Sequence, residues 1–174
     1  MGGRFYQAAA QLPDNVRLQT LLPPLALADL DSLTLQRRDQ SSLRFRADER
    51  RRWWLSATSA GDLVGLAGRY HARFEDRQWR HDGERWLLAS QRRLADIVFR
   101  TTSTDVVGFV APEQVTPAQL AELGLAPPYR GVTLHGGDEA WNLSFGESQP
   151  EQMVLARREG ALVMTRDVAL APLE

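Results

Sequence analysis

Apolar and polar residues alternate with a period of two in several short runs, and this pattern predicts β-strands. The first two runs lie at 33–35 and 43–45, on either side of a polar turn at 39–41. A charged connection at 48–52 then leads into Trp53-Trp54-Leu55, a third apolar run. These runs predict antiparallel hairpins in the first part of the chain.

The clearest strand pattern lies nearer the C-terminus, where Trp141, Leu143 and Phe145 alternate strictly with Asn142 and Ser144. Side chains on a strand point alternately to its two faces, so the three large side chains should face the core and the two polar ones solvent. Further apolar runs come before and after this one, at 132–134, 153–155 and 161–165. Their spacing predicts a C-terminal antiparallel β-meander.

A helical pattern separates these two β regions. Leu94, Ile97, Val98 and Thr101 recur at the spacing that places side chains on one face of a helix. The glycine-punctuated segment at 61–68 fits either a short helix or a loop. We therefore expect two or three short helices to cover one face of the sheet.

A second short helix is predicted from Pro117 to Leu123. Thr116 can cap its first turn together with Gln119, and proline is favoured at the first helical position. Gly124 follows where a left-handed residue usually ends a helix. This helix completes an α+β fold, with antiparallel β-hairpins and a C-terminal β-meander covered by short helices.

The domain organisation follows from where these patterns begin. Residues 1–31 form a poorly specified N-terminal segment, for which we expect only a short helix at 5–12. Residues 32–174 form a single α+β domain. A strand, a charged turn and a Trp-Leu pair occur twice, so the domain is interpreted as two related half-units, 32–68 and 69–174.

Composition narrows the function classes. The chain has 174 residues, 43% of them hydrophobic and 25% charged, which is typical of a globular protein. The net charge of −1 gives no overall attraction to nucleic acid or anionic lipid. Without cysteine the chain has neither a disulfide framework nor a thiolate nucleophile. No apolar run approaches the roughly 18 residues that suggest a transmembrane helix, so no membrane span is expected in this chain.

The candidate binding site is Arg50, Arg51 and Arg52 beside Trp53 and Trp54. If both indole rings lie on a strand, one must face outward, and an exposed tryptophan flanked by arginines is typical of a protein-binding hot spot. Cations beside stacking rings also suit single-stranded nucleic acid. We rank nucleic acid below a protein partner because two acidic residues precede the arginines.

Catalytic and metal motifs are weak. His135-Gly136-Gly137 lies near Ser148, but Pro150 stands where a nucleophile elbow needs its second glycine. His71 and His81 are not at metal-ligand spacing from His135 or from each other. We therefore assign no catalytic residue, no metal and no cofactor. A small enzyme whose site is assembled from distant residues remains an alternative hypothesis.

A set of motifs across residues 72–166 resembles the bacterial domain-of-unknown-function family numbered 4340, which accompanies ABC transporters and gliding-motility-type auxiliary proteins. The residues that carry the resemblance are Trp86-Leu87, Ala95-Asp96, Leu120, Leu123-Gly124-Leu125, Pro127-Pro128, Val132, Leu134, Leu143 and Gly146. It implies a non-catalytic scaffold or accessory module of an ABC-type membrane or envelope complex, with a membrane component as protein partner. It also implies a periplasmic or anchor-associated location, the alternative being cytoplasmic.

Overall fold

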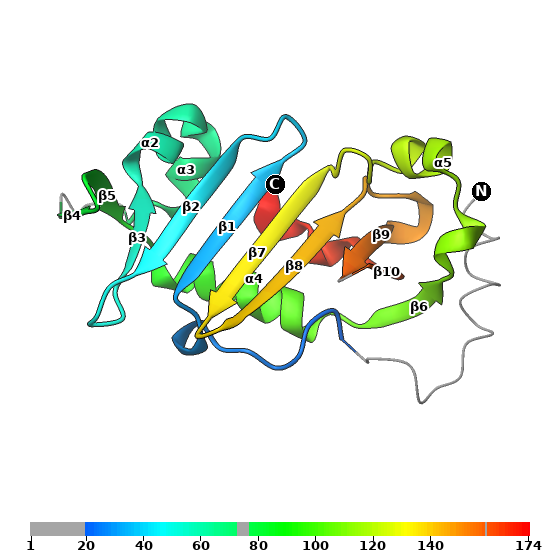
Figure 1. The fold of residues 1–174 in the computed structure, drawn as a ribbon, viewed down its shortest axis with the longest axis horizontal. Coiled ribbons are helices and arrows are strands. Elements are labelled where there is room, and N and C mark those ends of the chain that lie inside the picture. Colours follow the sequence, from blue (N-terminus) through cyan, green and yellow to red (C-terminus); the bar gives the residue numbers. More distant parts are fainter. Residues whose placement is uncertain (1–19, 73–76, 159) are drawn as a thin grey trace.

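The computed structural model describes residues 20–72, 77–158 and 160–174, so the helix expected at 5–12 lies outside the described residues. Within these ranges ten strands form one sheet in which every neighbouring pair is antiparallel (Figure 1). The strands are β1 (Ser32–Arg37), β2 (Ser42–Ala47), β3 (Trp53–Ser56), β4 (Gln78–His81), β5 (Glu84–Leu88), β6 (Val106–Val110), β7 (Arg130–Gly136), β8 (Glu139–Phe145), β9 (Met153–Arg158) and β10 (Ala161–Arg166).

The strand order is β4-β5-β3-β2-β1-β7-β8-β9-β10-β6. At its centre β1 pairs with β7, and Leu33 lies opposite Leu134. On one side of this pair lie β2, β3, β5 and β4, and on the other lie β8, β9, β10 and β6. Both expected half-units therefore contribute strands to the same sheet.

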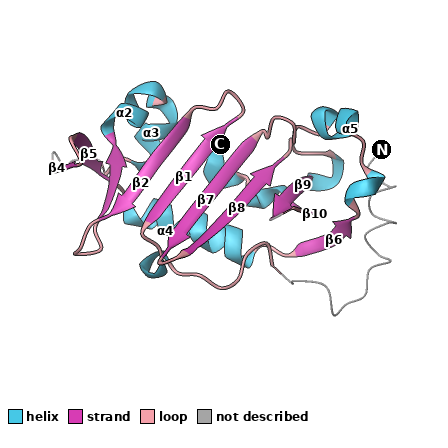
Figure 2. Ribbon diagram, in the orientation of Figure 1, coloured by secondary structure: helices cyan, strands magenta, loops and turns pink. Residues whose placement is uncertain are grey.

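The described α-helices are α2 (Ala57–Asp62), α3 (Val64–Tyr70), α4 (Gln91–Ser103) and α5 (Pro117–Glu122). The glycine-punctuated segment is helical, as α2 and α3. Leu94, Ile97, Val98 and Thr101 of α4 are all buried, which confirms the predicted helical face. Figure 2 shows α4 crossing behind the central strands, so the α+β fold class is confirmed.

The main core lies between the sheet and α4. Phe145 and Leu143 are buried in it, and Trp141 packs against it while partly exposed. Asn142 is exposed and Ser144 is half-buried. This confirms the predicted orientation of β8.

A second, smaller core covers the opposite face of β9 and β10. Met153 and Leu155 belong to it, whereas Val154 and Ala156 of the same strand belong to the main core. Leu120, from α5, packs against this second core. The last strands are therefore buried on both faces, which hydrophobic alternation did not predict.

The capped helix α5 has the predicted geometry. Thr116 and Gln119 form the reciprocal capping box, and Gly124 has a φ of 79°. The backbone N–H of Leu125 donates to the carbonyl of Leu120 at 2.8 Å, which is the bond that closes a Schellman motif. The predicted stop at Gly124 is confirmed.

Candidate functional site

The two tryptophans of the predicted site are both buried. Trp53 is 1% exposed in the main core, and Trp54, on the other face of β3, is 2% exposed. The expectation that one ring faces solvent is wrong, because the β4–β5 hairpin lies beside β3. Trp79 of β4 packs on Trp54 with ring centroids 5.9 Å apart, and the guanidinium of Arg52 lies 5.5 Å from the Trp54 ring.

Asp48 organises the loop that precedes β3. Its carboxylate accepts from the indole N–H of Trp54 at 3.0 Å and from the backbone N–H groups of Arg50 and Arg52, each at 2.9 Å. The Arg52 Nε donates to the same carboxylate at 2.9 Å. The Asp48 side chain is only 8% exposed. Burial raises the pKa of Asp48, but the hydrogen bonds from Trp54 and Arg52 outweigh it and hold the pKa below its usual value.

The three arginines of the predicted site have different roles. Arg51 is exposed but is engaged within the molecule: it donates to Asp31 at 2.9 Å and to the carbonyls of Ala28 and Leu30. Arg52 is paired with Asp48. Arg50 is exposed, and its side chain has no hydrogen-bond or ion-pair partner within the described ranges. Of the five predicted residues, Arg50 is therefore the one most available to a partner.

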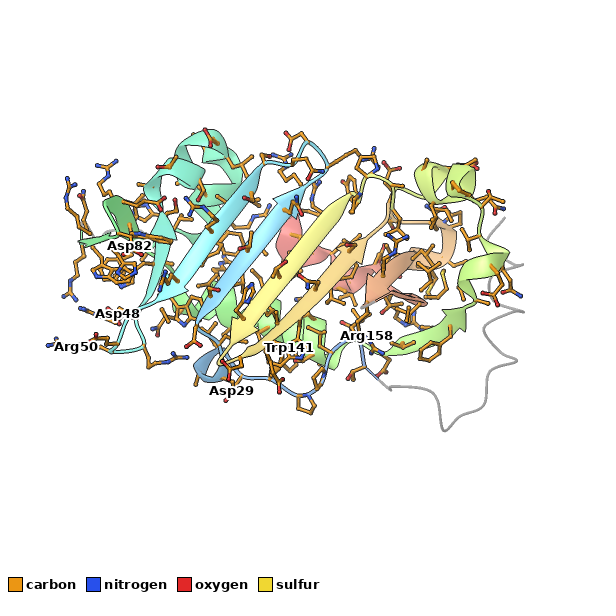
Figure 3. All side chains as sticks on the ribbon, viewed as in Figure 1. Asp29, Asp48, Arg50, Asp82, Trp141 and Arg158 are labelled. Carbon is orange, nitrogen blue, oxygen red and sulfur yellow. The ribbon has the colours of Figure 1, made fainter. Side chains whose placement is uncertain are left out.

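An open groove of about 690 Å³ lies beside this loop. It runs from the end of β2 across the loop to β4, and Figure 3 shows Asp48 and Arg50 at this outer end of the sheet. We call it the arginine groove, and its lining residues are Arg46, Ala47, Asp48, Glu49, Arg50, Arg52, Trp79 and His81. Its volume lies within the usual range for ligand and peptide pockets.

Trp79, His81 and Arg46 are groove residues that the sequence reasoning missed. The Trp79 and His81 rings stack with centroids 4.6 Å apart and an angle of 20° between planes. The alternation of Trp79 and His81 before the Asp82-Gly83 turn could have placed both on one face of a hairpin. Arg46 lies directly opposite Trp54 in the sheet register, which local pattern alone does not reveal.

The charges of the groove do not cancel at its rim. Three guanidinium groups and two carboxylates line it. Asp48 pairs with Arg52, so the remaining charged side chains of the lining are Arg46, Arg50 and the single carboxylate of Glu49. The side chains of Arg46 and Arg50 have no ion-pair partner in the described part of the chain. The rim is therefore locally cationic in a protein whose net charge is −1.

The weak catalytic and metal motifs have structural explanations. Gly136 lets the short helix η2 (Leu27–Asp29) approach closely, because a Cβ there would lie 2.3 Å from the carbonyl oxygen of Asp29. Ser148 donates to the carboxylate of Asp167 at 2.6 Å. The described residues contain no cluster of three or more potential metal ligands.

Comparison with models of protein families, with curated proteins and with solved structures finds no match to this chain. None of the described helices has the length and apolar character needed to cross a bilayer. The function must therefore be inferred from the arginine groove and its charges.

Proposed function

We propose that the protein is a non-catalytic binding module and that the arginine groove docks an acidic segment of a partner protein. One observation carries the proposal: the unpaired guanidinium groups of Arg46 and Arg50 flank Trp79 and His81 in an open groove. Arginine and tryptophan are enriched in binding hot spots, and arginine clusters recognise acidic and phosphorylated peptides. The rim cations would also steer an acidic segment into the groove.

A protein partner fits the groove better than single-stranded nucleic acid. Stacking on bases needs an aromatic face that is free. The faces of Trp79 are occupied by other rings, since His81 stacks on it and Trp54 and Trp86 lie 5.9 Å and 6.1 Å away. The groove therefore offers charge and shape to a ligand, with little open aromatic surface for a base.

Docking also fits this groove better than catalysis. A general acid needs a carboxyl group whose pKa is raised toward the working pH. The pKa of Asp48 is shifted the other way, and its oxygens are already engaged by the loop and by Trp54. Asp48 therefore supports the loop and is poorly suited to proton transfer.

We further propose that the partner belongs to an ABC-type membrane or envelope complex and that docking takes place in the periplasm. Support for this part comes from the resemblance to the family numbered 4340. An accessory module of such a complex would need a surface for a membrane component, and the cationic groove is suited to an acidic segment of one.

The experiment is quantitative affinity capture from detergent-solubilised membranes of the native organism. Arg46→Glu and Arg50→Glu should each weaken capture of one defined protein by about tenfold or more, because they place like charges against an acidic segment. Arg85→Glu is the matched control, since Arg85 is an exposed arginine of β5 outside the groove lining.

Two results would contradict the proposal. Equal capture by all variants would show that the groove is not the docking site. Salt-dependent binding to single-stranded oligonucleotides that is lost in Arg50→Glu would instead favour the nucleic-acid hypothesis.

A further inference from the structure

A second cationic cleft, of about 290 Å³, lies on the helical side of the molecule. Its walls are α3, α4 and the short C-terminal helix η6 (Ala171–Leu173), and its lining residues are Arg69, Tyr70, Arg93, Asp96, Arg100, Ala171 and Pro172. Tyr70 is 1% exposed and its hydroxyl donates to the carbonyl of Pro172, so the floor of the cleft is tied to the C-terminal segment. The cleft is thus assembled from three separate parts of the chain.

The charges in this cleft are unbalanced. Three arginines face one carboxylate, Asp96, which is 3.3 Å from the Nε of Arg100. Arg69 and Arg93 have no side-chain hydrogen bond or ion pair to any residue that the structure describes. Two guanidinium groups are therefore left without a counter-charge at a concave site.

The start of α4 adds to the positive potential. A helix N-terminus carries a partial positive charge, so acidic residues are favoured in the first turn and cations are not. The first turn of α4 contains Arg92 and Arg93 and no acidic residue. A bound anion would offset this arrangement, which otherwise disfavours the folded state.

We propose that this cleft binds a small phosphate monoester in its dianionic form. The two unpaired guanidinium groups match its charge, and the arginine fork forms paired hydrogen bonds to phosphate oxygens. The cleft volume is at the small end of the usual range for ligand sites, which suits a short ester better than a nucleotide. This proposal does not depend on the function of the arginine groove.

The test is isothermal titration calorimetry of the whole protein with inorganic phosphate and with glycerol 1-phosphate, at constant ionic strength. Each of Arg69→Gln and Arg93→Gln should weaken binding by about tenfold or more, because each removes a charge-assisted hydrogen bond. Arg92→Gln is the matched control, because Arg92 is in the same first turn but outside the cleft lining. The affinity of this variant for both ligands should stay within about twofold of that of the parent protein.

Several outcomes would overturn the proposal. These are the absence of saturable binding, an equal loss of affinity in Arg92→Gln and Arg93→Gln, or succinate binding as tightly as phosphate.

A lipid headgroup and a soluble ester share the same chemistry, so a second experiment compares binding to vesicles with and without phosphatidic acid. Vesicle binding that requires Arg93 would identify the lipid as the source, and binding of glycerol 1-phosphate alone would identify a soluble ester.

Discussion

Replacing Gly124 by alanine separates two costs that the structure assigns to this position. Gly124 has a φ of 79°, a conformation that costs a non-glycine residue about 1–2 kcal/mol. A Cβ would also lie 2.9 Å from the backbone nitrogen of Glu147 and 2.9 Å from the guanidinium of Arg38. Arg38 could move, but the Glu147 nitrogen is held at 3.0 Å by the carbonyl of Leu123.

Gly83 is the matched control, because its φ is 76° and a Cβ there would meet nothing within 4 Å. Alanine at either site also lowers the conformational entropy of the unfolded chain, which offsets about 0.4–1 kcal/mol of the cost. Gly83→Ala should therefore lower the free energy of unfolding by about 0.5–1 kcal/mol. Gly124→Ala should lower the free energy of unfolding by about 1–3 kcal/mol more than Gly83→Ala does, because its Cβ overpacks against Glu147.

Urea denaturation of the parent and both variants measures this difference directly, provided that the denaturant slope stays constant. Equal losses for Gly83→Ala and Gly124→Ala would refute the close contact between the α5 cap and the loop after β8. The cap would then be an ordinary surface turn.

Three further predictions concern the core and its ionisable groups. Phe145→Ala should cost about 3–5 kcal/mol in chemical denaturation, whereas Ser144→Ala should stay within about 0.5. Folding lowers the pKa of Asp48, so the ionised carboxylate stabilises the protein above the unfolded pKa of about 3.9, and this stabilisation is lost as pH falls through the folded pKa. The free energy of unfolding should therefore fall less between pH 7 and pH 3 in Asp48→Asn than in the parent protein. Burial raises the pKa of Tyr70 to about 12, so stability should fall as pH rises above the unfolded value of about 10, and Tyr70→Phe should reduce that fall in alkaline melts.

The parts of the fold that could be predicted from sequence are those determined by neighbouring residues. The orientation of β8 follows from the alternation of Leu143 and Phe145 with polar residues, since side-chain direction on a strand is fixed locally. The end of α5 follows from Thr116, Gln119 and Gly124, whose capping bonds span only a few residues. Each of these features has its cause within one or two turns of chain.

The candidate site could be predicted only in part, because distant contacts determine which side chains are free. Trp54 is covered by Trp79, which comes from a hairpin further along the chain. Arg51 looked like a free cation, but it bonds the carbonyls of Ala28 and Leu30. No local pattern distinguishes Arg51 from Arg50, although the fold engages the side chain of Arg51 in hydrogen bonds and leaves that of Arg50 without one in the described part of the chain.

The central claim is that a partner protein docks in the arginine groove through an acidic segment. The most direct measurement is site-specific photo-crosslinking from position 49, where Glu49 is exposed on the groove lining, in the native organism. A benzoylphenylalanine at position 49 should crosslink to one protein, and mass spectrometry should locate the crosslink in an acidic segment. The same probe at Glu139, which is exposed outside the groove lining, should not capture that segment. A crosslink from both positions, or from neither, would contradict docking at the groove.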